Sequence, residues 1–490
     1  MFIPLLLVAA LTGTAGQPLP SLAASTHPSK EQRPLNVLII DICSARADHF
    51  GTYGYSRDTT PGMDKFANEN VLFENAMAQS SWCLPNYASL LTGHIPEVHG
   101  QYIVSPFLKP DKTVPTMAEK MKEAGYRTAA FSGGIFSLQA WGLDRGFDVY
   151  EALFSTRTHE PRKFADYSPR ALDWLKKDPA KPFFLYTTVD DLHAPYQSDN
   201  PNRYSPDSEG SPISTMAAHV RFFRAYNGEP IELADPLRSF LKEFREEPAH
   251  LQQLIARYDA SLNHVDRKVS DFLSQVKNLG LWDNTLIIVT ADHGELLNEQ
   301  GLLGHTESLY EPVLHVPLMV HHPDYAHRAG TRVRGLVQRI DLTPTVYEAA
   351  GVDYEHLQLQ GKSLISLLEN PSANLREYAF ASSKRSLAAG RKNLDIDERV
   401  VRDQRWKLHW YQYKDRFELY DLLKDPLETQ DLAEQRPDII SRLSFQLLNH
   451  FESSRPHAPG LPYKREPPNP VQIVPRTQHL NRLGSSEHTP

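Results

Sequence analysis

One cysteine in this sequence stands where a thiol could act as a nucleophile. Cys83 lies two residues before Pro85, at the start of a short helical run, and proline suits the first turn of a helix. We therefore expect Cys83 at a helix entrance, where unpaired backbone N–H groups favour an anion and lower the pKa of a thiol. For a cysteine taken alone, burial as a small hydrophobic side chain is the common alternative.

Carboxylates and an imidazole follow two apolar runs that are typical of buried parallel strands. Asp41 ends the run 35–40, and Asp292 with His293 follows the run 285–290. In open α/β sheets ligands bind beyond the carboxyl ends of the strands, so we expect these side chains at one edge of the sheet. Carboxylate and imidazole together indicate a divalent cation, although a single aspartate there also serves as a helix cap.

Two further histidines have the pattern of proton donors near such an edge. His193 follows the apolar run 182–189, and His305 follows Gly304. The pKa of an imidazole lies near neutrality, which suits a general acid that protonates a leaving oxygen. An ordinary loop position is the alternative for both side chains.

The stretch around Cys83 resembles the signature of the sulfatase family, within the alkaline phosphatase superfamily. The family pattern is C-x-P-x-R followed by A-x-L-L-T-G, and this chain has Tyr87 in place of the arginine. In the family an enzyme that reads this arginine oxidises the cysteine to formylglycine. The resemblance implies that Cys83 is the nucleophile, either as formylglycine or as a thiol. The matching residues are Cys83, Pro85, Ala88, Leu90, Leu91, Thr92 and Gly93.

A second block of the family covers the sequence from Asp292 to His305. Many arylsulfatases have Asp-Asn where this chain has Asp292-His293, and several phosphonate and phosphodiester hydrolases of the superfamily have Asp-His. The resemblance implies that one divalent cation is bound by Asp41, Cys83, Asp292 and His293. Ca²⁺ is the expected ion, and Mn²⁺ or Zn²⁺ are the alternatives that an imidazole favours. The resemblance also gives His193 a contact with the sulfate or the leaving group, and His305 the role of general acid.

The sequence departs from the family at two further places. The gap between Asp41 and Arg46 is longer than in family members, and Cys43 falls within it. If Asp41 and Cys83 share a metal, Cys43 lies near Cys83, and a disulfide between the two cysteines would block the site. After Gly134 the chain lacks the lysine and histidine of the segment G-K-W-H-L-G, which hold the sulfate in many sulfatases.

These residues predict a metal-dependent sulfuric ester hydrolase that acts on a small-molecule or carbohydrate sulfate ester. A formylglycine hydrate at Cys83 would attack sulfur with one hydroxyl, and its second hydroxyl would then expel sulfate. An unmodified thiol lacks that second hydroxyl, so its turnover would be poor. Two alternatives stay open: a phosphodiester or phosphonate monoester hydrolase of the same superfamily, and a catalytically silent member that binds an anion.

The apolar runs and helical patterns that position these residues in the sequence predict an α/β fold. The resemblance implies an alkaline-phosphatase-like α/β/α sandwich with a mixed central sheet over residues 35–375 and a small antiparallel α+β subdomain over residues 376–452. Val265, Val269, Phe272 and Val276 recur at helical spacing within 251–279, which indicates a core-facing helix. Residues 197–250 are expected to form an insertion near the substrate entrance, and residues 453–490 a Pro-rich tail.

Composition narrows the class of partner and the compartment. The chain has 490 residues with 52 basic and 60 acidic side chains, a net charge of −8, which argues against a nucleic-acid partner. Residues 1–24 contain an apolar run and then small residues, as in a secretory signal peptide, so we expect a secreted or periplasmic protein. The run 2–11 is too short for a membrane span, and we expect no span elsewhere. The sequence leaves the oligomeric state open.

Overall fold

The computed structural model describes residues 34–101, 113–137, 139–154, 162–205, 211–306, 308–385 and 396–453. The predicted signal peptide and, apart from residue 453, the predicted tail lie outside these ranges. None of the helices within them combines the length and the hydrophobicity that a membrane span requires.

The apolar runs of the sequence form a mixed sheet, to which the described residues contribute nine strands. In chain order the strands are β1 (Asn36–Ile42), β2 (Val71–Met77), β3 (Arg127–Ser132), β4 (Val149–Ala152), β5 (Phe183–Val189), β6 (Thr285–Ala291), β9 (His315–Val316), β10 (Leu318–His321) and β11 (Arg332–Gln338). The order across the sheet is β11-β2-β10-β6-β1-β5-β3-β4, and β9 pairs with β2. Strand β10 runs antiparallel to both of its neighbours, so the predicted mixed sheet is confirmed.

The register of the three central strands aligns their carboxyl ends. Strand β1 is buried along its whole length and runs parallel to β5 on one side and β6 on the other. Asp41 pairs with Thr188 of β5 and with Thr290 of β6, so all three strands end within two residues of this level. Residues that follow β5 and β6 are therefore delivered to the same edge as Asp41.

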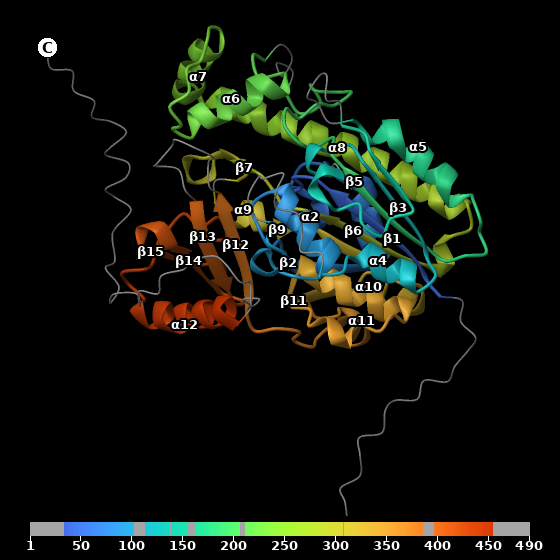
Figure 1. Ribbon diagram of the computed structural model, residues 1–490. Helices are drawn as coiled ribbons and strands as arrows, with labels where there is room; N and C mark the ends of the chain where they lie inside the picture. The colour runs from blue at the N-terminus through green and yellow to red at the C-terminus, as the bar shows by residue number, and fades with distance from the viewer. Residues whose placement is uncertain are drawn as a thin grey trace, which may run out of the picture. The chain divides into compact units, whose positions relative to one another are not determined.

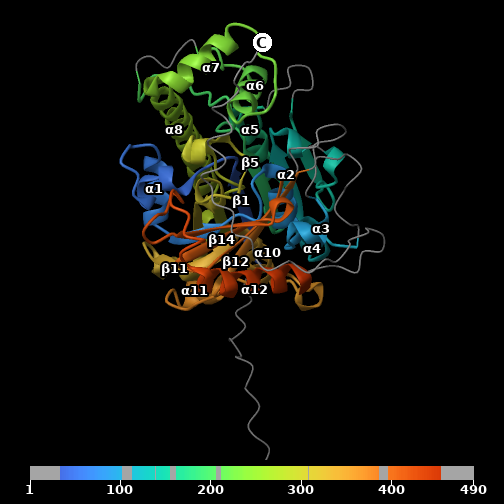
Figure 2. The ribbon, with the colours of Figure 1, turned by 90° about the vertical axis from the view of Figure 1, so that its left-hand side faces the viewer.

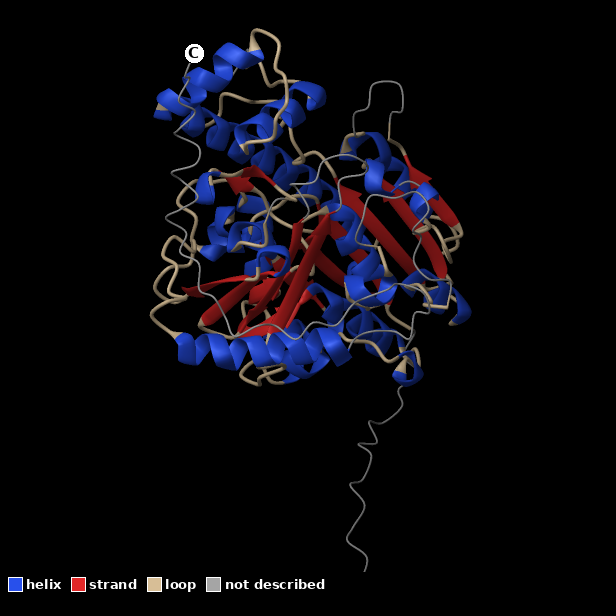
Figure 3. Ribbon diagram, turned by 60° about the vertical axis from the view of Figure 1, so that its left-hand side comes forward, coloured by secondary structure: helices blue, strands red, loops and turns tan. Residues whose placement is uncertain are grey.

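Helices cover both faces of this sheet, as Figures 1 and 3 show. On one face lie α1 (Pro61–Asn68), α5 (Phe164–Leu175) and α8 (Pro248–Asn278), and on the other lie α2 (Cys83–Thr92), α4 (Met117–Glu123), α10 (Leu342–Ala350) and α11 (Ile365–Glu369). The predicted stripe of α8 is buried at Val265, Val269, Phe272 and Val276. The α/β/α sandwich is therefore confirmed. The remaining helices are α3 (Pro96–His99), α6 (Met216–Tyr226), α7 (Leu237–Glu246), α9 (Glu311–Leu314) and α12 (Pro437–Ser453).

A second sheet lies in the C-terminal part of the chain, where an antiparallel sheet was predicted. Its strands pair in chain order and are all antiparallel: β12 (Ala379–Arg385), β13 (Ile396–Arg402), β14 (Trp406–Tyr411) and β15 (Arg416–Asp421). Figure 2 faces this sheet, with α12 packed along it. The boundary between residues 375 and 376 stays a prediction.

Buried charges on β14 attach the second sheet to the segment that follows His305. The Lys407 ammonium lies 3.0 Å from Glu311 Oε1, and Arg402 of β13 lies 2.6 Å from Glu311 Oε2. His409 lies 2.7 Å from both Glu398 Oε1 and Glu428 Oε1. Because buried carboxylates are stable only when cations and donors compensate them, this cluster fixes where the second sheet meets α9.

We expect His409 to make the folded protein less stable above neutral pH. Burial lowers the pKa of His409, but the Glu428 and Glu398 carboxylates outweigh burial and raise it from 6.5 to about 9. The stability that its proton contributes, about 3 kcal/mol, is fully present below pH 6.5 and is lost as the pH rises through 9. Among the described residues, the titratable or charged groups around His409 include Glu398, Glu428, Glu418, Lys407, Tyr310, Tyr411 and Tyr420.

Urea unfolding at a series of pH values measures this effect. The variant His409→Gln should be less stable than the parent at pH 6.5, and its free energy of unfolding should change less between pH 6.5 and 9. An equal decline in both proteins would assign the pH dependence to other groups.

Candidate active site

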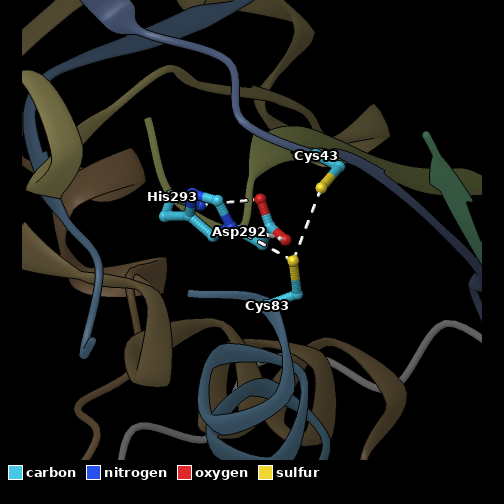
Figure 4. A group of neighbouring side chains, drawn as sticks. All are labelled: Cys43, Cys83, Asp292 and His293. Atoms are coloured by element: carbon cyan, nitrogen blue, oxygen red, sulfur yellow. Dashed lines mark hydrogen bonds and ion pairs between the residues drawn. The ribbon is translucent and has the colours of Figure 1, made fainter. Parts of the chain in front are cut away.

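Side chains from five segments converge at the edge where β1, β5 and β6 end. The ligand atoms of Cys43, Cys83, Asp292 and His293 all lie within 4.8 Å of one another, and Figure 4 shows these side chains pointing toward one another. The ligand atoms of Cys83, His193 and His305 form a second such group. Cys83 is the member that both groups share, so the structure brings five of the six predicted site residues together around it.

Cys83 is the first residue of α2, as the sequence predicted. Its backbone follows the extended residue Trp82, and its side chain is only 3% exposed. Its Sγ lies 3.6 Å from Cys43 Sγ and 3.2 Å from His293 Nε2. The Cys43 thiol holds the pKa of Cys83 well below its usual range, against burial and with the help of His293, whereas burial raises the pKa of Cys43 well above its own. Of the two thiols, Cys83 is therefore the one whose deprotonation the surroundings favour.

Asp292 and His293 directly follow β6. Hydrogen bonds to the neighbouring backbone hold one side-chain atom of each residue, and the other atom is left to face Cys83 and its neighbours. Asp292 Oδ1 accepts hydrogen bonds from the backbone N–H of Ser44 at 3.0 Å and of His293 at 2.8 Å. Its other oxygen, Oδ2, has no hydrogen-bond partner among the described residues. His293 Nδ1 donates to the Gly294 carbonyl at 2.7 Å, so Nε2 is left to face Cys83. Burial raises the pKa of Asp292 to about 6.

Asp41 lies beside this cluster and is held by a cation that the sequence did not predict. Its Oδ2 accepts from Arg339 Nη2 at 2.5 Å and from Tyr186 Oη at 2.9 Å, while its Oδ1 has no hydrogen-bond partner in the described part of the chain. Arg339 follows β11 and also donates to the Asn86 carbonyl of α2 at 3.1 Å. Asp41 and Arg339 are both fully buried, so each compensates the charge of the other.

The two predicted proton donors lie next to each other. The ring centroids of His305 and His193 are 5.1 Å apart, and those of His305 and His293 are 4.4 Å apart. His305 Nδ1 lies 3.0 Å from Oε1 of Glu295, a buried carboxylate to which the sequence gave no role. Burial lowers the pKa of His305, but Glu295 and Cys83 outweigh it and raise this pKa well above its usual value. The surroundings of His305 therefore favour its protonated form, which is the form that can donate a proton.

The predicted insertion packs against the hairpin that carries His305. Strands β7 (Leu296–Leu297) and β8 (Leu303–Gly304) form this hairpin, and Asn227 after α6 exchanges two hydrogen bonds with Leu303, at 2.8 and 2.9 Å. Gly304 has φ +89°, and a Cβ there would lie 2.9 Å from the Phe223 ring of α6. Glycine is needed at this position for its backbone conformation and for the close approach of α6.

A small pocket opens beside His193. Its volume is about 70 Å³, and Arg162 and Lys163 supply its positive charge. It is lined by Arg162, Lys163, Asp190, Asp191, His193, Ala194, Pro195, Gln197 and Met216.

The donors of the site fit a divalent cation. Asp41 Oδ1 and Asp292 Oδ2 are buried acceptors without hydrogen-bond partners among the described residues. Buried acceptors of this kind are costly unless something compensates them. Ligand atoms of His293, Cys83, Asp292 and Cys43 form one group, which does not include Asp41. Thiolate sulfur, imidazole nitrogen and carboxylate oxygen are all donors that bind metals in proteins.

We expect Arg339→Met to destabilise the protein by about 3–5 kcal/mol, because it leaves Asp41 buried without its cation. In the double variant with Asp41→Asn the loss should be smaller than the sum of the single losses by about 2 kcal/mol, since the uncompensated charge is gone. Urea unfolding in the presence of a chelator measures both effects. Arg334→Met is the matched control, because that side chain is 87% exposed and its loss should cost less than about 0.5 kcal/mol. Additive losses would mean that the two side chains do not depend on each other.

Comparisons with known proteins place this arrangement in a family. Human N-sulphoglucosamine sulphohydrolase is 27% identical over 452 residues, which cover 82% of this chain and 86% of that protein. N-acetylglucosamine-6-O-sulfatase of Bacteroides thetaiotaomicron is 24% identical over 490 residues, which cover 84% and 85%.

Solved structures share the fold. A protein in complex with its substrate D-glucosamine-2-N,6-O-disulfate has a TM-score of 0.67 at 21% identity, covering 87% of this chain and 99% of the other. Phosphonate monoester hydrolase from Silicibacter pomeroyi has a TM-score of 0.65 at 21% identity, covering 86% and 96%. The family model "N-sulphoglucosamine sulphohydrolase, C-terminal" matches residues 301–453, and the model "Sulfatase" matches residues 36–352. Because that match spans most of the sequence, the chain belongs to the sulfatase family.

Proposed function

We propose that this chain is a metal-dependent sulfuric ester hydrolase with Cys83 as the source of its nucleophile. The observation that carries the proposal is the position of Cys83: it begins α2, and its sulfur lies within 4.8 Å of ligand atoms of His293, His193 and His305. One side chain therefore meets a group that can hold a metal and two groups that can donate protons. Membership of the sulfatase family supports the same reaction.

Asp41, Cys83, Asp292 and His293 would hold one divalent cation, with Ca²⁺ expected from the family resemblance and Mn²⁺ or Zn²⁺ as alternatives. When bound, the cation would neutralise the ester's charge and lower the pKa of the nucleophile. The chain contributes the orientation of its donors, because the bond from His293 Nδ1 to Gly294 fixes the tautomer that leaves Nε2 free. The N-terminus of α2 adds N–H groups for the charge that develops on the ester.

Maturation of Cys83 to formylglycine is part of the proposal. It exchanges sulfur and two hydrogens for one oxygen, and the hydrated aldehyde supplies the hydroxyl that attacks the ester. Tyr87 stands at the place of the family's arginine. Tyr87 is 2% exposed, and its hydroxyl has no hydrogen-bond partner among the described residues. Another arginine, Arg339, contacts α2: its guanidinium donates a hydrogen bond to the Asn86 carbonyl.

His305 would protonate the leaving oxygen, and His193 would contact the sulfate or assist this proton transfer. Glu295 holds His305 by its Nδ1, so Nε2 carries the proton that can be donated. The pair is half-buried next to the pocket that contains Arg162 and Lys163. That position lets an ester enter from the pocket with its leaving group toward the two imidazoles.

We propose a carbohydrate sulfate as the substrate, and a sulfated amino sugar in particular. The match of residues 301–453 to the C-terminal model of N-sulphoglucosamine sulphohydrolase supports this class, as do the names of the two curated relatives. Arg162 and Lys163 in the pocket beside His193 suit a second anionic group on the sugar. We further propose that residues 1–24 direct export of the protein to the periplasm or the medium.

A phosphonate monoester or phosphodiester hydrolase is the second candidate. The observation that favours it is the Asp292-His293 pair, whose imidazole faces the nucleophile at 3.2 Å. Phosphonate monoester hydrolases occur among the similar solved structures, where the likeness supports the fold. Hydrolysis rates on an aryl sulfate and on an aryl phosphonate of the same phenol separate the two reactions. Hydrolysis of neither ester would indicate a silent anion-binding member.

We expect Cys83→Ala to lower the rate of hydrolysis of a glucosamine sulfate by about 10⁴-fold or more, because the nucleophile is removed. Peptide mass spectrometry of the parent protein should show the mass of formylglycine at position 83. Cys83→Ser is the matched control, since it keeps a small polar side chain that cannot be matured in the same way. Full activity in either variant would remove Cys83 from the mechanism.

Replacement of His305 should lower the rate of hydrolysis by an amount that depends on the leaving group. We expect His305→Ala to slow hydrolysis of a sugar sulfate by about 10²–10⁴-fold, because an alcohol leaves poorly without a proton. The same variant should lose far less on an aryl sulfate with an acidic phenol. His356→Ala provides the control, because that histidine is 58% exposed. Equal losses on both esters would show that His305 does not act as the general acid.

A further inference from the structure

We propose that Cys43 is a metal ligand, and that together with Cys83, His293 and Asp292 it forms a tetrahedral zinc site. The inference rests on the proposed function, because it uses the same cation site. It places Cys43 in the ligand set instead of Asp41, and it selects Zn²⁺ from the proposed ions. Cys43 is 1% exposed, and its side chain points at Cys83 in Figure 4. The resulting donor set is two sulfurs, one nitrogen and one oxygen.

The spacing of the donor atoms matches the edges of a zinc tetrahedron. Zinc bonds of about 2.3 Å to sulfur and about 2.0–2.1 Å to nitrogen and oxygen give edges of about 3.8 Å for S···S, 3.6 Å for S···N and 3.4 Å for N···O. The distance from Cys43 Sγ to Cys83 Sγ is 3.6 Å, and that from Cys83 Sγ to His293 Nε2 is 3.2 Å. His293 Nε2 lies 3.5 Å from Asp292 Oδ2. These three edges of the six therefore lie within about 0.4 Å of the lengths that zinc requires.

Hydrogen bonds made by other atoms of the same residues and their neighbours hold the four donor atoms in place. Asp292 Oδ2 is a fully buried acceptor without a hydrogen-bond partner among the described residues, because both backbone donors nearby bind Oδ1. The N–H of Cys43 donates to Val189 of β5 at 3.0 Å, which continues the β1–β5 ladder past Ile42. Ser44 then adopts φ +63°, a conformation that is uncommon for residues other than glycine. This turn directs the Ser44 N–H to Asp292 and keeps Cys43 over the site.

The sulfur and nitrogen donors of this site favour zinc over the hard cations. Ca²⁺ takes six to eight oxygen ligands, whereas thiolate and imidazole favour Zn²⁺. The second nearby carboxylate, Asp41, has one oxygen already occupied by Arg339 and Tyr186. Within the described residues, two carboxylate oxygens near the site have no hydrogen-bond partner, one on Asp41 and one on Asp292. The other donor atoms are two sulfurs and one nitrogen, so the site has too few of these oxygens to bind Ca²⁺ by itself.

Loss of the Cys83 sulfur on maturation would change this site. The unmatured chain has the sulfurs of both cysteines, and the matured chain would keep only that of Cys43. Zinc bound to the unmatured chain would therefore occupy the sulfur that maturation must oxidise. Cys43 is the residue that gives this chain a thiolate in the cation site in either state.

The test is a titration of the metal-free, full-length protein, produced without maturation of Cys83, with Zn²⁺ and with Co²⁺, which is a spectroscopic probe of zinc sites. We expect one equivalent of Zn²⁺ to bind, and Co²⁺ to give a sulfur-to-metal charge-transfer band. Cys43→Ser should lose about half of that band in the unmatured chain and bind Zn²⁺ at least about 10-fold more weakly. Bound Zn²⁺ should protect both cysteines from iodoacetamide. Ser274→Ala is the control and should keep the band, because that side chain is exposed on α8, and circular dichroism checks that each variant is folded.

Other outcomes separate this inference from the proposed function. An identical Co²⁺ spectrum in Cys43→Ser would overturn the ligand role of Cys43 while leaving a metal-dependent hydrolase in place. Metal-free protein that contains no free thiol and has lost two hydrogens would overturn it as well, because the two sulfurs would then form a disulfide. A complete thiolate spectrum in a protein that hydrolyses no ester would support the zinc site and remove the proposed activity.

Discussion

The site depends on how the protein compensates negative charge that it removes from water. Asp41, Asp292, Glu295 and Cys83 are all buried, and an isolated buried anion is far more costly than any hydrogen bond can repay. Arg339 compensates Asp41 from the far end of β11, and His305 compensates Glu295 across its hairpin. Asp292 Oδ2 has no hydrogen-bond partner within the described chain, and the sulfur of Cys83 is surrounded by imidazoles and the Cys43 thiol. This residual charge is what makes the centre suitable for a divalent ion.

The secondary structure brings these groups together in two ways. The strand register places the ends of the strands at the same edge of the sheet, and helix α2 begins at that edge. Parallel pairing of β1 with β5 and β6 leaves the segments after all three strands at one edge. Helix α2 begins at the same edge, so its first residue meets the strand ends with its N–H groups unpaired. Further away, the Lys407 and His409 cluster holds the segment 308–311, which follows His305, against the second sheet.

Local patterns predicted the elements well because each has its signal within a few residues. Apolar runs gave β1, β5 and β6, and the structure extends β1 only to Ile42, one residue past Asp41. Cys83 begins α2, and Cys43 lies against it, as was expected if Asp41 and Cys83 share a metal. Arg339 was missed because its partner Asp41 is 298 residues away and no local pattern pairs them. Glu295 lies within the predicted block from Asp292 to His305, but its bond to His305 depends on a hairpin that sequence alone did not indicate.

The two sulfurs decide what kind of chemistry the centre favours. A thiolate whose charge is stabilised by a neighbouring thiol and an imidazole is a good ligand and a good nucleophile, but a single sulfur cannot be both at the same moment. Cys43 changes that balance, because it can keep one sulfur in the cation site when Cys83 is oxidised or occupied by substrate. A carboxylate at position 43 would favour a hard ion, and an apolar side chain would leave the site one donor short. The identity of residue 43 is therefore a physical link between the metal that the centre selects and the freedom of Cys83 to react.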